Sequence, residues 1–200
     1  GNMDNDIEGE VLMKKGVRTT PWIFWPRRPY VMENMLKEKE TLNWVDRDIE
    51  SIFIGNFENK IQEKYRKTVD DWERVLDVYH CTAGKKHKFD QDEYLDFLRR
   101  SRYGLCLRGF GRKCHREVEC MAWGTVPIIT DEVCISSYIN PPKEGIHYIR
   151  AHDTEDMRRK LKGISRARWE MMSGACVEWY KENVHSGGSW NTTIKHILYD

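Results

Sequence analysis

The stretch "YGLCLRGFGRKCHREVECMAWGTVPIIT", residues 103–130, has the order strand, glycine-containing loop, helix, strand. Residues 103–107 and 125–130 are almost continuously apolar, which is typical of strands that are buried on both faces. Between them, residues 115–123 place apolar side chains at helical spacing. Two strands joined through a helix lie parallel in one sheet, because the helix carries the chain back to the edge where the first strand began. This unit therefore predicts an α/β fold.

The same alternation of strands and helices extends over most of the chain. Further strands are expected over 51–55, 74–81 and 146–151. Further helices are expected over 30–40, opened by Pro29, and within the segments 57–72, 89–101, 153–164, 166–184 and 189–200. We therefore predict a Rossmann-like parallel sheet with helices on both faces over residues 51–200.

Two segments precede the predicted sheet. Residues 1–20 are polar and are expected to be a disordered lead. Residues 21–50 are expected to form an N-terminal extension. Its aromatic side chains, which we expect to pack in a core or an interface, are Trp22, Phe24 and Trp25.

The charges of the chain are nearly balanced, with 33 Lys and Arg against 32 Asp and Glu. A chain without a basic excess is not a typical nucleic-acid-binding protein, so any anion site must be local. The longest apolar runs fall far short of the roughly 20 residues that cross a bilayer, and no membrane span is expected. Six cysteines without a CxxC pair indicate reduced thiols and, with the acidic N-terminal segment, favour a cytoplasmic protein.

The loop between strand 103–107 and helix 115–123 has the composition of a phosphate site. Ligands of parallel sheets bind at the carboxyl ends of the strands, where this loop lies. Gly109 and Gly111 allow a ligand to approach the backbone, and the helix start offers unpaired N–H groups. The cations of the loop are Arg108, Arg112 and Lys113. Since cations beside a helix N-terminus oppose its dipole, a bound anion would stabilise the arrangement, and we predict a diphosphate site. A solvated basic loop is the alternative.

A dinucleotide site is a second interpretation of the same loop. "GFGRKC" resembles the fingerprint GxGxxG, and Asp131 lies 20 residues beyond Gly111, where an acidic residue would hold a ribose. However, Cys114 stands in place of the third glycine, and the unit follows the third predicted strand rather than the first. A nicotinamide-dependent oxidoreductase is therefore the less favoured function.

The stretch "REVECMAWGTVPIIT", residues 116–130, resembles the nucleotide-sugar-binding half of GT-B glycosyltransferases, particularly exostosin-like enzymes. In that family an arginine and an acidic residue precede a small-residue turn and a strand that contains Val-Pro. Arg116, Glu119 and Gly124 match these positions. Fucosyltransferases with the same half-fold carry a similar "GTVPVV" element. "IFIGNFENKIQEKYR" also resembles the first strand and loop of the family, so the resemblance covers roughly residues 50–185.

The resemblance implies a site for a nucleoside-diphosphate sugar linked to UDP or GDP. Arg116 would neutralise the diphosphate together with the loop cations, and Gly55 and Asn56 would border the phosphates from the first strand. Glu119 would accept hydrogen bonds from the ribose hydroxyls. The alternative for Glu119 is a surface carboxylate paired with Arg116 or Arg112.

The nucleobase would lie at the end of the second predicted strand. Tyr79 and His80 are placed to meet it there, although His80 could equally be a packed loop histidine. The resemblance also implies an acceptor, a glycan or a glycoprotein. If the chain is a piece of a larger enzyme, a second domain of that polypeptide is a further partner.

Fixed cations at a departing diphosphate stabilise its developing charge, so no metal or other cofactor is expected. Glycosyltransferases of the other main fold use a metal ion and place an Asp-x-Asp motif after a strand. Two such motifs, at 46–48 and 90–92, are the candidates for a metal site in this chain. The second motif opens a helix, and capping explains it better.

The sequence does not identify the general base that would deprotonate the acceptor hydroxyl. His115, Asp131 and Glu132 lie near the same sheet edge and are the candidates. The favoured function is a metal-independent glycosyltransferase domain, inverting by analogy with exostosins and fucosyltransferases. The alternative is a non-catalytic module that binds nucleotide sugar or another protein.

Overall fold

The computed structural model describes residue 15, residues 25–136 and residues 138–199. The predicted disordered lead, except residue 15, and the aromatic residues Trp22 and Phe24 lie outside the described residues. Five strands form one sheet with the order β2-β1-β3-β4-β5, and every neighbouring pair is parallel. The strands are β1 (Ile49–Phe57), β2 (Val78–Ala83), β3 (Ser101–Cys106), β4 (Val126–Ile129) and β5 (Ile149–Arg150). The predicted Rossmann-like α/β class is confirmed.

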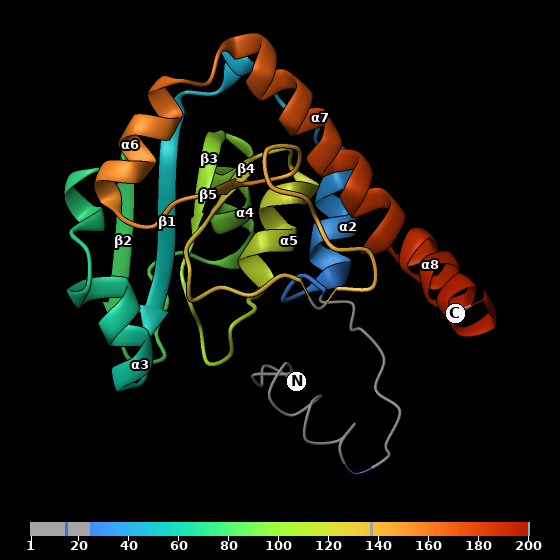
Figure 1. Cartoon of the computed structure of the whole chain (residues 1–200), viewed down its shortest axis with the longest axis horizontal. Coiled ribbons are helices and arrows are strands. Elements are labelled where there is room, and N and C mark those ends of the chain that lie inside the picture. The colour runs from blue at the N-terminus through green and yellow to red at the C-terminus, as the bar shows by residue number, and fades with distance from the viewer. Residues whose placement is uncertain (1–14, 16–24, 137, 200) are drawn as a thin grey trace.

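Helices cover both faces of the sheet, as predicted (Figure 1). The α-helices are α2 (Pro29–Glu38), α3 (Lys60–Glu63), α4 (Gln91–Arg99), α5 (His115–Ala122), α6 (Thr154–Lys162), α7 (Arg166–Asn183) and α8 (Ser186–Tyr199). Two 3-10 turns, η1 (Trp44–Asp46) and η3 (Trp72–Arg74), and one π turn, η2 (Lys64–Thr68), complete the described elements. None of the described helices is both long enough and apolar enough to cross a membrane.

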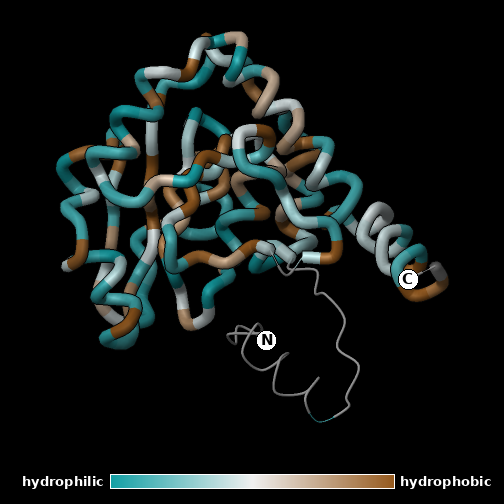
Figure 2. The backbone as a smooth tube through the Cα atoms, viewed as in Figure 1, coloured by the Kyte–Doolittle hydropathy of each residue, from teal (hydrophilic) through white to brown (hydrophobic). Residues whose placement is uncertain are grey.

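Alternation along the strands divides the core into two hydrophobic layers. In β1, Ile52 and Ile54 join the layer formed by α2, α4, α5 and the C-terminal half of α7. Phe53 points to the opposite layer, which η3, α6 and the start of α7 cover. Successive side chains of a strand point to opposite faces, so a fully apolar strand is buried on both. Figure 2 shows hydrophobic colour along the inner strands and hydrophilic colour over much of the periphery.

Most predicted element boundaries agree with the structure to within a few residues, and the segment 57–72 does not. Its helical spacing gives only the single turn α3 and the π turn η2, and the chain then breaks before η3. Two neighbouring β-branched residues, Thr68 and Val69, followed by Asp70 and Asp71, are poor helix formers and explain the break. Trp72 turns into the core instead, and β2 begins four residues later than predicted.

The strand order places a topological switch point between β1 and β3. From β1 the chain first adds β2 on one side and then returns to add β3, β4 and β5 on the other. In parallel sheets with this order, the connections leave the two central strands in opposite directions, and a crevice opens at their carboxyl ends. The end of β1 and the loop after β3 therefore form the position where the fold places a ligand.

Candidate functional site

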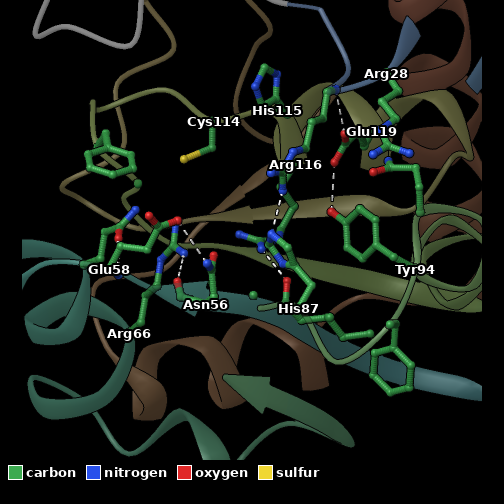
Figure 3. A pocket seen from close by; sticks show the side chains of 18 of the residues that line it. Arg28, Asn56, Glu58, Arg66, His87, Tyr94, Cys114, His115, Arg116 and Glu119 are labelled. Carbon is green, nitrogen blue, oxygen red and sulfur yellow. Dashed lines mark hydrogen bonds between the residues drawn. The ribbon is translucent and has the colours of Figure 1, made fainter. Parts of the chain in front are cut away.

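A cavity of about 440 Å³ lies at this switch point (Figure 3). Its walls come from the end of β1, the turns that follow it, the loop after β3, the start of α5, the loop before α4, and the chain before α2. The lining residues are Arg27, Arg28, Ile54, Gly55, Asn56, Glu58, Gln62, Arg66, His87, Phe89, Asp90, Gln91, Tyr94, Gly109, Phe110, Cys114, His115, Arg116 and Glu119. Sequence-predicted site residues from two distant segments, 55–56 and 109–119, thus meet around one hollow.

Arg116, on the first turn of α5, reaches across to β1. Its guanidinium donates a hydrogen bond to the carbonyl oxygen of Ile54 and lies 4.4 Å from the ring centre of Phe53. The residue is only 8% exposed, and its Nε has no hydrogen-bond partner in the described part of the chain. Gly55 makes room for it, since a Cβ there would stand 3.0 Å from Nη2 of Arg116. A buried donor without a partner costs free energy unless a ligand satisfies it.

Arg66, from the π turn, approaches the same place from the other side. It donates to the carbonyl oxygens of Asn56 and, at 3.0 Å from Nε, of Arg108. Its guanidinium carbon lies 5.8 Å from the same Phe53 ring. Burial lowers the pKa of Arg66, and the charge of Arg116 lowers it further. Repulsion between two guanidinium groups therefore acts inside this wall.

Neither buried arginine has a carboxylate partner. Within residues 25–136 and 138–199, no Asp or Glu forms an ion pair with Arg66 or Arg116. Buried charges are normally paired, because desolvation of an isolated ion costs several kcal/mol. Arg66 and Arg116 thus place two like charges in one wall without an ion-pair partner within the described ranges, and the carboxylates that line the same cavity are Glu58, Asp90 and Glu119.

Glu119 lies three residues after Arg116 on α5, and it is not a surface carboxylate. It is 2% exposed; one oxygen accepts from the backbone N–H of Arg27 at 2.9 Å, and the other accepts from the Tyr94 hydroxyl at 2.9 Å. The alternative that Glu119 pairs with Arg116 or Arg112 is therefore wrong. Each carboxylate oxygen can accept two hydrogen bonds and here accepts one, so both oxygens can still bind a ligand hydroxyl.

The loop after β3 contributes glycine and cysteine to the cavity rather than its three cations. Gly109 lines the cavity, where an added Cβ would stand 2.4 Å from Sγ of Cys114. Burial raises the pKa of the Cys114 thiol to about 12, so this residue is not a thiolate nucleophile at neutral pH. Gly111 is buried within the loop and does not line the cavity.

The cations of the loop point elsewhere. Arg112 donates to the carbonyl oxygen of Glu132 at 3.4 Å and lines a second cavity of about 270 Å³. Lys113 is buried, with Nζ 5.3 Å from the ring centre of Tyr138, and Arg108 lies beside the ring of Tyr65. The structure thus does not bring these three predicted phosphate ligands to the cavity.

The helix start behind the loop is already capped by a side chain. The carboxylate of Glu117 accepts the backbone N–H of Cys114 at 3.0 Å, as in a capping box. Burial raises the pKa of Glu117 to about 7, against the lowering effect of the backbone hydrogen bonds. In its ionised form, this carboxylate compensates part of the local positive charge from inside the protein.

The three predicted base candidates lie in different surroundings, and Glu132 accepts a hydrogen bond of 2.7 Å from the hydroxyl of Thr130. His115 lines the cavity, and its Nδ1 donates to the carbonyl oxygen of Trp25 at 2.6 Å. Asp131 lines the second cavity and accepts a hydrogen bond of 2.8 Å from Nδ1 of His152. The pair of Asp131 and His152 joins the ends of β4 and β5, and sequence reasoning missed it.

The predicted nucleobase contacts Tyr79 and His80 do not line the cavity. Tyr79 stacks on Phe53 at 5.6 Å between ring centres, and its hydroxyl donates to the carbonyl oxygen of Arg66. His80 packs edge-on against Phe89 at 5.2 Å, as the alternative of a packed histidine predicted. Burial lowers the pKa of His80, and the neighbouring Lys88 lowers it further.

The Asp-x-Asp motifs have structural partners. Asp90 caps α4 through the N–H of Glu93 at 2.8 Å, which confirms the capping interpretation. Asp48 pairs with Arg100. In the described part of the chain, no group of three or more His, Cys, Asp or Glu side chains could hold a metal ion.

Comparisons with known proteins show a similarity in fold alone. No protein-family model and no curated protein matches the sequence. Among solved structures, the C-terminal domain of a glycosyl transferase group 1 family protein from Francisella tularensis is similar, with a TM-score of 0.48 and 12% identity. The match covers 82% of this chain and 97% of that domain.

Proposed function

We propose that this chain is the donor-binding domain of a glycosyltransferase, and that the cavity at the switch point holds the diphosphate of a nucleoside-diphosphate sugar. The observation that carries the proposal is the pair of buried guanidinium groups, Arg66 and Arg116, without a carboxylate partner. A diphosphate supplies the missing negative charge and accepts the unpaired Nε–H of Arg116.

The position of each wall supports this assignment. Arg116 and Glu119 reach the cavity from α5, where Glu119 accepts from Tyr94, and Arg66 reaches it from η2 (Figure 3). A carboxylate with spare acceptor capacity suits the hydroxyl groups of a ribose. The uncharged amide of Gln91 also lines the cavity, and its Nε2 has no partner in the described residues, so it is a candidate donor to the nucleobase.

Glycosyl transfer needs stabilisation of the departing diphosphate. When the bond between the anomeric carbon and the phosphate oxygen breaks, its electron pair stays on the diphosphate. Arg66 and Arg116 are held by backbone carbonyls before the ligand arrives, so they stabilise that charge with little reorganisation. Two fixed cations can do this without a metal ion, and we include metal independence and UDP or GDP as the nucleotide in the proposal.

Calorimetric titration of UDP and of GDP, each with and without EDTA, tests the proposal. We expect one nucleotide to bind in both conditions. Arg66→Ala and Arg116→Ala should each weaken nucleoside diphosphate binding by roughly 10- to 100-fold and leave nucleoside binding nearly unchanged, because each loses charged hydrogen bonds. Arg112→Ala is the matched control, since this loop arginine does not line the cavity.

Two results would contradict the proposal. The first is the absence of binding of either nucleotide at millimolar concentration by the folded wild-type chain. The second is an equal loss of nucleoside and nucleoside diphosphate affinity in the two arginine variants. Far-UV circular dichroism of each variant separates lost binding from lost folding, and Arg116→Lys, which keeps the charge but not the planar fork, gives a second variant.

A further inference from the structure

Residues 25–28 lie at the rim of the cavity before α2, with bends at 27 and 28, and we call this segment the strap. The strap is fixed to two elements, α5 and the loop before α4. The carbonyl oxygen of Trp25 accepts from His115 at 2.6 Å, and the N–H of Arg27 donates to Glu119 at 2.9 Å. The guanidinium of Arg27 donates to Nε2 of His87 at 2.8 Å.

These contacts give neither guanidinium group of the strap an ion-pair partner among the described residues. An arginine can only donate, so Nε2 of His87 must accept, and His87 is neutral when bound to Arg27. Burial lowers the pKa of His87, and the charge of Arg27 lowers it further, in agreement with a neutral ring. The contact therefore positions Arg27 without neutralising it.

Arg28 adds a second exposed charge on the same rim. Its side chain lines the cavity, while its backbone carbonyl accepts the first N–H groups of α2. In the described part of the chain, neither Arg27 nor Arg28 takes part in an ion pair. With Arg66 and Arg116 on the inner wall, four guanidinium groups line one cavity and none of them has a carboxylate partner.

We infer that the strap is part of the ligand site and that Arg27 and Arg28 bind the outer phosphate of the ligand. The inner phosphate contacts Arg66 and Arg116, and the strap completes the cation set from the solvent side. This inference rests on the proposed diphosphate ligand. It assigns a binding role to a segment that precedes the sheet, and it predicts that ligand and strap stabilise each other.

The double variant Arg27→Ala/Arg28→Ala tests this assignment, with UDP, GDP and inorganic pyrophosphate as probes. The backbone N–H of residue 27 remains in the variant, so the strap can still bind Glu119. We expect affinity for the diphosphates to fall by at least about tenfold, since two charged contacts are lost, while nucleoside affinity stays unchanged. The matched control is Lys37→Ala/Lys162→Ala, which removes the same charge from exposed positions outside the cavity.

Hydrogen exchange of the wild-type chain gives a second readout. Saturating nucleotide should slow exchange in the peptide that contains Arg27, because the ligand holds the strap against α5 and the loop before α4. Unchanged or increased diphosphate affinity in the double variant would overturn the inference, and increased affinity would make the strap an inhibitor of the site. If the wild-type chain binds no diphosphate, the proposed function fails and the inference fails with it. If the wild type binds and the two double variants lose affinity equally, only the inference fails.

Discussion

At the scale of single residues, the glycine at position 55 allows the charged side chain of Arg116 to lie against the sheet. Gly55 has no Cβ, and one placed there would lie 3.0 Å from both Nη2 of Arg116 and Cζ of Phe53. Contacts this short force the neighbours apart, and the guanidinium is the end that can shift. Gly55 therefore allows Arg116 to lie against the sheet, and it also lines the cavity.

We predict that Gly55→Ala weakens nucleoside diphosphate binding about fivefold, which corresponds to about 1 kcal/mol, with a smaller effect on the unfolding free energy. Alanine improves the strand itself, and this gain offsets part of the strain. Titration calorimetry and urea unfolding of the same samples measure the two effects. Gly174→Ala in α7 is the matched control: nothing lies within 4 Å of its added Cβ, so it should bind as wild type and be more stable by roughly 0.5–1 kcal/mol. A Gly55→Ala variant with wild-type affinity would contradict the steric role.

The cations of the site show what sequence patterns can and cannot predict. Arg116 was predicted from its match to the arginine of the glycosyltransferase motif, and it lines the cavity. Arg66 was missed because "KYRKT" has the pattern of a solvated basic helix, and only the π turn rotates this side chain inward. Arg112 and Lys113 have the expected neighbours in sequence, but the loop bends and turns both away. The direction of a side chain in an irregular loop depends on packing that no short-range pattern contains.

At the scale of elements, the strands were predictable because each is a short apolar run, and α4 was predictable because its acidic start and basic end match its dipole. The amino ends of β3 and β4 depend on a contact that the sequence does not indicate. Arg47 is 1% exposed and donates to the carbonyl oxygens of Ser101 and Trp123 and to the hydroxyl of Thr125. Burial lowers its pKa to about 9, an effect that the charge of Arg99 increases.

Arg47→Met tests the importance of this link between the two strands. Methionine fills a similar volume but removes the donors to the carbonyl groups of Leu42, Ser101 and Trp123, and each carbonyl group left without a donor costs about 1–3 kcal/mol. We therefore expect a loss of roughly 3 kcal/mol or more in the unfolding free energy, measured by urea unfolding. Arg74→Met, at an exposed ion pair with Asp71, should change stability by less than about 1 kcal/mol. A loss of similar size in both variants would show that the buried hydrogen bonds contribute little.

At the scale of the whole molecule, α7 connects the two hydrophobic layers. Trp169 and Met172, near its start, belong to the layer that contains Phe53. Trp179 and Tyr180, near its end, belong to the layer that contains Ile52 and the helices α4 and α5. One straight helix thus passes from one face of the sheet to the other at its edge (Figure 1). Loss of either layer would remove half of the packing surface of the same helix.

This arrangement predicts that the two layers unfold together. Trp169 donates to the carbonyl oxygen of Arg102 at 2.9 Å, and Trp179 donates to that of Asn140 at 2.8 Å, so the two rings share no partner. They lie about 15 Å apart along the helix. Trp169→Ala and Trp179→Ala should each cost about 3–5 kcal/mol.

Thermal unfolding followed by far-UV circular dichroism and by tryptophan fluorescence distinguishes one unit from two. In each variant, both signals should move to the same lower midpoint, because a single cooperative transition has one midpoint for every probe. Trp190→Ala in α8, where the ring is 67% exposed, provides a control that should leave the midpoint nearly unchanged. If Trp169→Ala instead gave two separate transitions, with one layer still folded after the first, α7 would pack against both hydrophobic layers without coupling their unfolding. The cavity would then be sensitive only to changes in the layer that contains α5. With one cooperative unit, changes in either layer should weaken nucleotide binding through the population of folded protein.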